Sequence, residues 1–323
     1  MPPTAPRFPA QDSPTSPVRA DQGPPGSSRP YRYRLVDVFT DQRFHGNPLA
    51  VFTDARGLSA EQMQRIAREL QHTETTFVFP PVDRAHDYSI RIFSPHAELP
   101  TAANPSIGTA FAIAHDRAPA PDPKQRMVFD EASGPISVSL ISPISTTKQE
   151  VPRFGTRYPE PHTAAAVLSL GMEDMLGGVP VQAVGASLPY LLIPVANLEA
   201  LQRIRLRLDI WERTIRRFEA PHIYAFCLQA SHPGSTATAR MFAPALGIME
   251  APASETACGP LAAYLIHYRL VASRPDHVFV FEQGAEIGRP SRIHVSAREV
   301  DGKVSELRVG GQCVLVGEGM IFV

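Results

Sequence analysis

The chain has 323 residues, of which 43% are hydrophobic and 20% are charged, and its formal net charge is -1. These values are typical of a globular protein, and the weak net charge gives no reason to expect nucleic acid or an anionic membrane as a partner. No apolar run approaches the roughly 20 residues that cross a bilayer, and the N-terminus lacks a basic-then-apolar secretion pattern. We therefore expect a cytoplasmic protein.

Three cysteines, Cys227, Cys258 and Cys313, are too few and too far apart to indicate a disulfide framework or a cysteine zinc site. The histidines show no metal-ligand spacing, and no glycine-rich phosphate-binding motif is present. We expect neither a metal nor a cofactor. Cys258 falls in the first turn of a predicted helix, where a thiol pKa is lowered, but a buried small residue is the favoured interpretation.

Residues 1–30 contain nine prolines among mostly small and polar residues, a composition that cannot bury enough apolar surface to fold. This stretch is predicted to be a disordered tail. Strands are then expected near residues 33–39, 49–52, 73–79 and 87–93. Ser59 and Gln62 form a capping-box pattern that predicts a helix to about residue 70, and Asn104 with Pro105 predicts an N-cap before a second helix.

The second half repeats this order. Strands are expected near 188–195, 221–229 and up to 242, a helix end near 213–218, and a helix from about 255 to 268 capped by Ser254. Further strands are expected near 278–282, 292–295, 306–309 and 313–317. Both the helix after Asn104 and the helix after Ser254 are apolar nearly all round, so each should be buried.

A sheet wrapped around one buried helix satisfies this pattern in each half, and the strands follow one another too closely for a doubly wound parallel sheet. We therefore predict an α+β fold of two pseudo-symmetric domains. The first covers residues 31–145 and is completed by the C-terminal strand 313–323, and the second covers residues 146–312.

Glu74 is the first candidate for chemistry. In a strand, Glu74 shares its face with His72, Thr76 and Val78, so its carboxylate would be costly to bury without a partner. Burial would raise its pKa and suit it to general acid-base work. The alternative is a glutamate at the edge of a strand that points to solvent.

The starts of the two buried helices are the second candidate. A helix N-terminus offers free N–H groups and a positive dipole end, so two facing helix ends could hold an anionic substrate between them. The alternative is that Asn104 and Ser254 only cap their helices.

Several motifs, in order over about residues 33–323, resemble the phenazine-biosynthesis PhzF-like family. They are found at 44–52, 63–69, 74–78, 91–93, 98–100, 108–110, 240–244, 259–265, 282–284, 288–291 and 309–311. The resemblance implies the diaminopimelate-epimerase fold, a cofactor-free isomerase and a homodimer. It also implies that Glu74 is the acid and base that moves a proton across an allylic system, and that Asn47 lies near the substrate.

This chain departs from the family pattern at two loops. Asn104 replaces the His of Ala-Gly-His-Pro, so it can form hydrogen bonds but cannot relay a proton. Ala251 replaces the Asp of Asp-Pro-Ala-Thr-Gly-Ser, and its missing charge should lower the pKa of a nearby carboxylate unless Glu255 takes its place. Ala103 and Glu255 replace glycines, whereas Thr256 keeps a hydroxyl.

Glu255 is therefore expected either to face Glu74 as a second carboxylate or to complement the dipole of its own helix. We expect an isomerase or tautomerase of specialised metabolism that acts on a small conjugated carboxylate other than the family's dihydro-hydroxyanthranilate. Glu74 would move the proton, and Asn47, Ala103, Asn104, Glu255 and Thr256 would bind the substrate. The alternatives are a non-catalytic binding protein and a cyclase that acts by shape alone.

Overall fold

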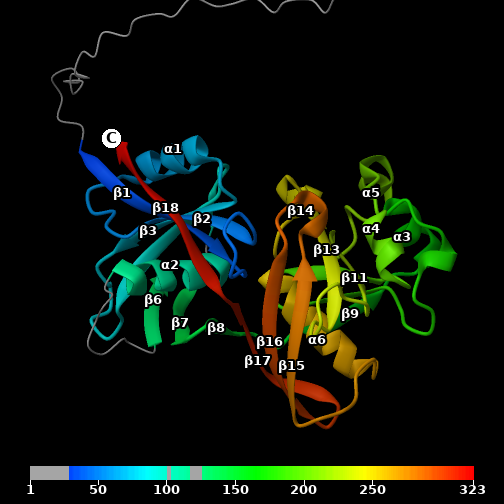
Figure 1. Ribbon diagram of the computed structural model, residues 1–323. Coiled ribbons are helices and arrows are strands. Elements are labelled where there is room, and N and C mark those ends of the chain that lie inside the picture. Colours follow the sequence, from blue (N-terminus) through cyan, green and yellow to red (C-terminus); the bar gives the residue numbers. More distant parts are fainter. Residues whose placement is uncertain (1–28, 100–102, 117–125) are drawn as a thin grey trace, which may run out of the picture.

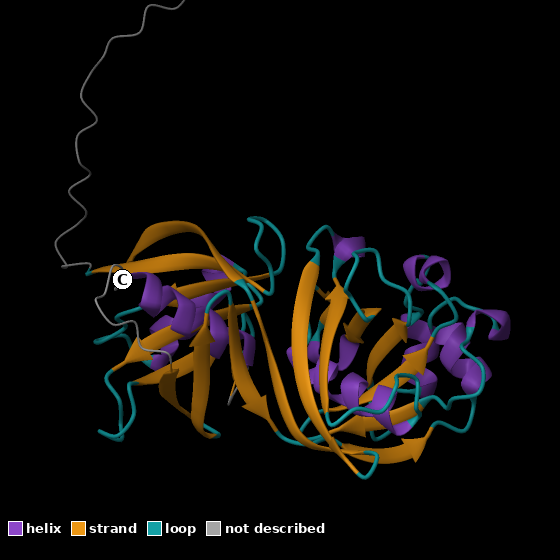
Figure 2. Cartoon of the chain, turned by 60° about the horizontal axis from the view of Figure 1, so that its bottom comes forward, coloured by secondary structure: helices purple, strands orange, loops and turns teal. Residues whose placement is uncertain are grey.

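The computed structural model describes residues 29–99, 103–116 and 126–323. Two halves of similar build lie side by side, each with strands curved around one helix (Figures 1 and 2). Most of the predicted tail lies outside the described residues. Its last two residues do not extend the tail, because Arg29 donates a backbone hydrogen bond to Val323 and Pro30 begins the first strand. Among the described residues, no helix has the length and apolar character needed to cross a bilayer.

The N-terminal half contains every element that the sequence predicts for it, with shifted ends. The elements are β1 (Pro30–Val38), β2 (Asn47–Phe52), α1 (Ala60–Leu70), β3 (Glu74–Phe79), β4 (Tyr88–Phe93), β5 (Glu98–Leu99), α2 (Ala103–Asp116), β6 (Arg126–Glu131), β7 (Gly134–Ile141), β8 (Ile144–Gln149) and the last strand of the chain, β18 (Cys313–Phe322). The strands β5 to β8 have no counterpart among the sequence predictions, because Ser, Thr and charged residues dilute their apolar alternation.

The C-terminal half contains the predicted elements and several others. Together they are β9 (Arg153–Arg157), α3 (Pro161–Val167), β10 (Gln182–Gly185), β11 (Pro189–Pro194), α4 (Leu198–Gln202), α5 (Leu208–Thr214), β12 (His222–Cys227), β13 (Ala237–Ala243), β14 (Ile248–Ala251), α6 (Glu255–His267), β15 (Asp276–Gln283), β16 (Ser291–Val300) and β17 (Lys303–Gly311). Here β9, β10, β14, α3 and α4 were not predictable from the pattern of apolar residues.

Strand pairing shows that the two halves are copies of one design. In the first half, β1–β2 is antiparallel, β2–β3 parallel, β3–β4 antiparallel, β4–β6 parallel, and β6–β7 and β7–β8 antiparallel. The second half repeats this series of directions in the same order, in the pairs β10–β11, β11–β12, β12–β13, β13–β15, β15–β16 and β16–β17. The predicted pseudo-symmetric α+β fold is therefore confirmed.

Each half encloses one helix. The helix α2 packs against β1, β2, β7 and β8, and α6 packs against the four corresponding strands β10, β11, β16 and β17. This arrangement follows from composition, because a helix that is apolar on every side must be covered on every side. Of the 13 residues of α6, Thr256 and His267 alone are not buried.

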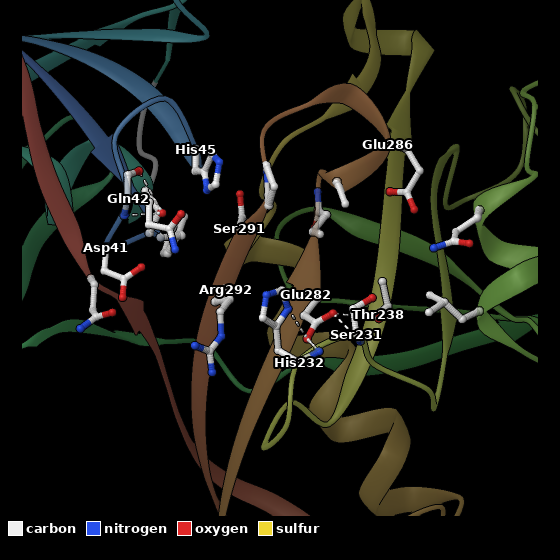
Figure 3. Close-up of a pocket in the computed structure, with 18 residues that line it drawn as sticks. Asp41, Gln42, His45, Ser231, His232, Thr238, Glu282, Glu286, Ser291 and Arg292 are labelled. Carbon is white, nitrogen blue, oxygen red and sulfur yellow. Dashed lines mark hydrogen bonds and ion pairs between the residues drawn. The ribbon is translucent and has the colours of Figure 1, made fainter.

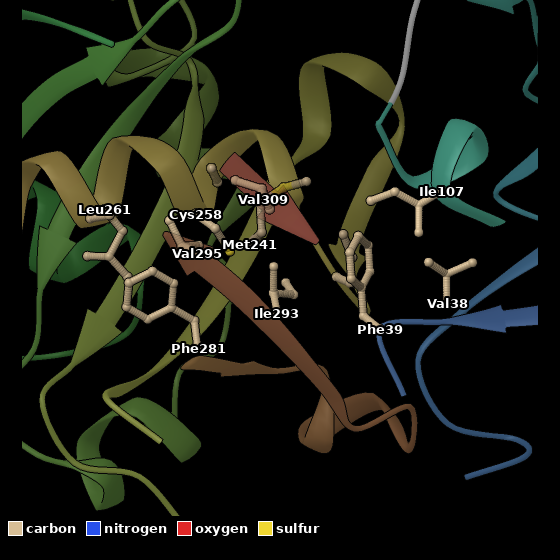
Figure 4. Packing of buried hydrophobic residues seen from close by; sticks show 14 of the residues in the cluster. Val38, Phe39, Ile107, Met241, Cys258, Leu261, Phe281, Ile293, Val295 and Val309 are labelled. Atoms are coloured by element: carbon tan, nitrogen blue, oxygen red, sulfur yellow. The ribbon is translucent and has the colours of Figure 1, made fainter. Parts of the chain in front are cut away.

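The two halves are joined by strand pairing and by a shared core. The strand β8 pairs with β17 of the other half, and β18 crosses back to pair with β1. At the junction, Phe39 lies between Val38 and Ile107 of the first half and Ile293 of the second, and all four belong to one buried cluster (Figure 4). The N-terminal ends of α2 and α6 meet at this junction, where the backbone N–H of Asn104 donates to Glu255.

Candidate active site

Glu74 begins β3 beside β2, where Leu49 is its partner in the parallel register. The residue is half-buried, and its Oε2 atom accepts hydrogen bonds from Nδ2 of Asn104 at 2.5 Å and Nδ2 of Asn47 at 3.4 Å. Two amide donors therefore converge on one carboxyl oxygen. This geometry contradicts the alternative of a strand-edge glutamate that points to solvent.

Asn104 does not cap its helix as expected. The helix α2 begins one residue earlier, at Ala103, and the fully buried side chain of Asn104 turns to Glu74 instead. A helix N-cap uses its side-chain oxygen to accept a backbone N–H, whereas Asn104 uses its nitrogen to donate to a carboxylate. Of the loop before α2, residues 100–102 lie outside the described residues.

Glu255 is buried at the first position of α6, and its carboxylate reaches the other half of the molecule. Its Oε1 atom accepts the backbone N–H of Asn104 at 3.3 Å, in the first turn of α2. Glu255 therefore occupies the positive end of α2, where the sequence suggested a seat for the substrate. Asn104 connects the two acids, because its backbone N–H donates to Glu255 and its side-chain amide donates to Glu74.

The environment raises the pKa of Glu74 from its usual value to about 8. Burial of the carboxyl group is the largest cause, the negative charge of Glu255 is the second, and the hydrogen bonds from Asn104 and Asn47 oppose both. The negative charge of Glu255 therefore acts on Glu74, which was one of the two expectations for this residue.

Thr256, the second residue of α6, is exposed at the start of the helix. Its Oγ1 atom lies 2.6 Å from the hydroxyl of Tyr190, which is buried on β11. Burial raises the pKa of Tyr190, so the phenol stays neutral and holds the threonine hydroxyl in place. The backbone N–H of Thr256 lies in the first turn, where no carbonyl of the same helix can accept it.

Ser254 stands at the N-cap position of α6, but its side chain makes no capping bond. Its Oγ atom accepts from Nε2 of Gln283 at 3.0 Å, and the same nitrogen donates to the carbonyl of Ala251 at 2.8 Å. Gln283 therefore fixes the loop that leads into Glu255. The sequence predicted the position of the cap and was wrong about its hydrogen bond.

Cys258 lies in the first turn of α6, where a lowered thiol pKa was one expectation. Burial instead raises the pKa of this thiol, which lies 3.2 Å from the hydroxyl of the buried Tyr224. The structure therefore supports the favoured interpretation of Cys258 as a small buried residue.

A cavity of about 210 Å³ opens between the two halves (Figure 3). His45 and Gln42 line it from the first half, and Glu282 and Ser291 line it from the second. Glu74, Asn104 and Glu255 are not among the described residues that line this cavity. Gln283 belongs to the wall of this cavity and donates to Ser254, so the cavity adjoins the loop that leads into Glu255.

Sequence reasoning missed an ion pair that holds the loop before Asn47. Arg289 donates to the buried Asp37 through Nη2 and to the carbonyl of Gly46 through Nε at 3.0 Å. The other oxygen of Asp37 accepts the backbone N–H of Phe44 at 2.6 Å. The motifs around Gly46 and Arg289 were each visible in the sequence, but their contact joins residues 252 positions apart.

Residues 36–319 match the family model of the phenazine biosynthesis-like proteins. An uncharacterized isomerase of Mesorhizobium japonicum is 34% identical over 302 residues, which cover 90% of this chain and 98% of the relative. The trans-2,3-dihydro-3-hydroxyanthranilate isomerase of Pseudomonas aeruginosa is 32% identical over 298 residues, which cover 90% of this chain and 99% of that enzyme.

Several solved structures are similar in fold to this chain. A phenazine biosynthesis protein of the PhzF family from Bacillus anthracis has a TM-score of 0.83 at 23% identity, with 91% of this chain and 100% of that chain covered. A hydroxyproline epimerase from Agrobacterium vitis has a TM-score of 0.56 at 10% identity, with 91% of each chain covered. At these identities the likeness shows the epimerase fold alone.

Proposed function

Because the chain belongs to the phenazine biosynthesis-like protein family, which includes isomerases, we propose that it is an isomerase in which Glu74 moves a proton on a small conjugated substrate. The observation that supports this most is the place of the Glu74 carboxyl group, which two amide donors orient and whose pKa lies far above its usual value. A carboxyl group with a pKa near neutrality both accepts and returns a proton at physiological pH.

The proposed reaction needs one acid-base group. The ionised Glu74 removes a proton from a carbon next to a conjugated system, and the electron pair of that C–H bond spreads into the system. The protonated Glu74 then returns the proton to another carbon on the same face, so that a double bond shifts. Because no electrons are gained or lost, the step is an isomerisation that calls for no redox cofactor.

The other residues of the proposed site would either orient Glu74 or bind the substrate. Asn47 and Asn104 orient the carboxyl group of Glu74 through their amide nitrogens. Thr256, through its hydroxyl and its own backbone N–H, would bind a substrate carboxylate, since that helix end is positive and Thr256 is exposed. Ala103 and Glu255 would shape the pocket where the family has glycines. A role in specialised metabolism and a homodimeric state remain predictions from the family.

The test is Glu74→Gln, which keeps the hydrogen-bonding shape but cannot accept the proton. Candidate substrates, beginning with trans-2,3-dihydro-3-hydroxyanthranilate, are screened with the wild-type protein in heavy water for isomerisation and deuterium uptake. With the substrate found in this screen, kcat of the variant should fall about 10²–10⁴-fold. Glu61→Gln, a change at an exposed glutamate of α1, should leave kcat unchanged. Activity of Glu74→Gln within about tenfold of wild type would exclude Glu74 as the general base.

A binding protein without catalysis is the second candidate. The observation that favours it is Asn104, which contacts Glu74 but has no titratable group to exchange a proton with it. A binding protein would retain the ligand in heavy water without deuterium uptake, and washed-in deuterium would exclude this role. A third candidate, a cyclase that acts by shape, would instead turn over its substrate equally well with Gln at position 74.

A further inference from the structure

The cavity between the two halves is distinct from the proposed proton-transfer site. The loop from β1 to β2 forms one wall with Gln42 and His45, and the opposite wall includes Glu282 and Glu286 of the second half (Figure 3). None of the residues proposed above to move the proton or to bind the substrate is among the described residues of this wall. A molecule that fills the cavity therefore meets a different set of groups from a substrate held at Glu74.

The wall of this cavity is acidic. Among its described residues are three with carboxyl groups, Asp41, Glu282 and Glu286, and one arginine, Arg292. Burial and, second, the charge of Arg292 lower the pKa of His294, so this cation acts farther along β16. The two histidines of the wall add no charge in their neutral form. The cavity therefore favours a cation over an anion.

Two of these three acids are stabilised without a ligand. Glu282 accepts the backbone N–H of Ser231 at 2.9 Å and that of His232 at 2.8 Å. Asp41 is exposed to solvent, so water can solvate its carboxylate. Neither acid needs a bound cation to offset a cost of burial.

Glu286 is compensated less. Its side chain is 13% exposed, and its Oε2 atom is buried without a hydrogen-bond partner among the described residues. Nε of Arg240 lies 4.0 Å away, but Nε and Nη2 of Arg240 donate to Glu250 and Nη1 donates to backbone carbonyls. Burial raises the pKa of Glu286, and its own backbone N–H and the charge of Arg240 offset this only in part. A nearby cation with N–H groups would lower the cost of this carboxylate.

A second residue of the wall has the same lack of a donor. Gln283 is 2% exposed, and its Nε2 atom donates to the carbonyl of Ala251 and to Oγ of Ser254. Its Oε1 atom is buried and has no partner among the described residues. Consecutive turns of the wall, at Gln283 and Glu286, therefore both leave an acceptor for which the protein supplies no donor.

We propose that this cavity binds a small organic cation with several N–H groups, an alkylammonium or an alkylguanidinium, and that Glu286 is its carboxylate partner. The described residues contain no group of three or more His, Cys, Asp or Glu that could hold a metal ion, so an organic cation fits the wall better. Its N–H groups are the donors that Glu286 and Gln283 lack, and Leu198 and Ala285 give its alkyl part an apolar surface. Because both halves line the cavity, the cation would bridge them.

The experiment compares each cation with an uncharged molecule of similar shape. Propylguanidinium is paired with propylurea, and butylammonium is paired with butanol. Dissociation constants are measured by nuclear magnetic resonance titration at neutral pH for the wild type, Glu286→Gln, Gln42→Lys and the exposed control Glu61→Gln. We expect at least one cation to bind the wild type about tenfold or more tightly than its uncharged counterpart, a gain typical of a hydrogen bond to a charged group.

This preference should fall about tenfold in Glu286→Gln, which keeps the shape of the side chain and loses its charge, and should persist in Glu61→Gln. Gln42→Lys adds a positive charge at an exposed residue of the opposite wall, so it should weaken the cation about threefold or more and leave the uncharged molecule unaffected. The proposal is wrong if no cation is preferred, if Glu286→Gln keeps the full preference, or if Gln42→Lys binds the cation as tightly as the wild type.

Glu255→Gln separates this cavity from the proton-transfer site. Glu255 is not among the described residues of the wall, so the preference for the cation should persist in this variant. A preference that disappears in Glu255→Gln and survives in Glu286→Gln would place the cation beside Glu74 and overturn the proposal.

Discussion

Asn104 contacts the acidic side chains of Glu255 and Glu74, the first through its backbone N–H and the second through its amide nitrogen. A histidine at this place could exchange protons with Glu74, whereas an amide can only fix its position. The resemblance predicts an acid at the position of Ala251, and Glu255, four residues later in the chain, is a negative charge that raises the pKa of Glu74. On this prediction, the site keeps a second negative charge and lacks a second proton carrier.

This arrangement makes the pH dependence of the reaction a test of Glu255. As a base, Glu74 must be ionised, so kcat/KM of the wild type should rise with pH and level off above about 8. Glu255→Gln removes a like charge that disfavours ionisation, so the rise should move to lower pH. The measurement is the pH profile of kcat/KM for both proteins with the same substrate.

Glu69→Gln is the matched control for the profile, because Glu69 lies on α1, is exposed, and is not among the groups that shift the pKa of Glu74. Its profile should coincide with that of the wild type. A Glu255→Gln profile that stays in place or moves to higher pH would contradict the electrostatic coupling of the two acids.

At the scale of elements, a glycine marks the closest approach of each central helix to its sheet. A Cβ atom on Gly108 of α2 would lie 2.5 Å from Cδ2 of Leu49 and 2.8 Å from Cγ2 of Val38. On Gly259 of α6, a Cβ atom would collide with Leu307. The helices α2 and α6 can therefore pack this closely against their strands only because Gly108 and Gly259 have no side chain.

Gly108→Ala should therefore destabilise the protein although alanine favours helix. Overpacking of a full core costs about 1–3 kcal/mol, and the helix propensity of alanine offsets at most about 1 kcal/mol of this. Urea denaturation of Gly108→Ala and Gly177→Ala provides the comparison, since a Cβ atom on Gly177 meets nothing within 4 Å. Equal midpoints for the two variants would show that the contact at α2 is not tight.

Local signals predicted some elements well and others not at all. The capping box of Ser59 and Gln62 is present, and α1 ends at Leu70 as expected. The strands β6 to β8 were not predictable, because β8, for example, has the sequence ISTTKQ, and its place in the sheet depends on pairing with β7 and β17. Such strands are stabilised by neighbours that are distant in sequence.

At the scale of the whole molecule, the pair of Asp37 and Arg289 joins the two halves. Asp37 is buried, and Arg289 also holds Gly46, whose φ of 66° requires glycine in the turn before Asn47. The pair therefore couples the position of the second half to the amide that contacts Glu74.

Arg289→Gln should cost on the order of 3 kcal/mol of stability, because it leaves a buried carboxylate without its cation. It should also lower kcat, since the loop before Asn47 loses an anchor. Arg65→Gln is the control, because Arg65 and its partner Glu61 are 73% and 74% exposed and such pairs contribute about 0–1 kcal/mol. Urea denaturation and steady-state kinetics test both effects. An Arg289→Gln protein as stable as Arg65→Gln would contradict the role of this pair as a clamp.

The sequence by itself determined the class of fold, the family and the two central helices. These follow from apolar composition and from motifs that are local in the chain. Tertiary structure alone decided the use of Asn104 and Glu255, because Asn104 could equally have capped its helix and Glu255 could have complemented α6. Each instead contacts a residue far away in the chain, 30 positions for Asn104 with Glu74 and 151 for Asn104 with Glu255. Local patterns carry no information about such contacts, since these form only when the two halves pack together.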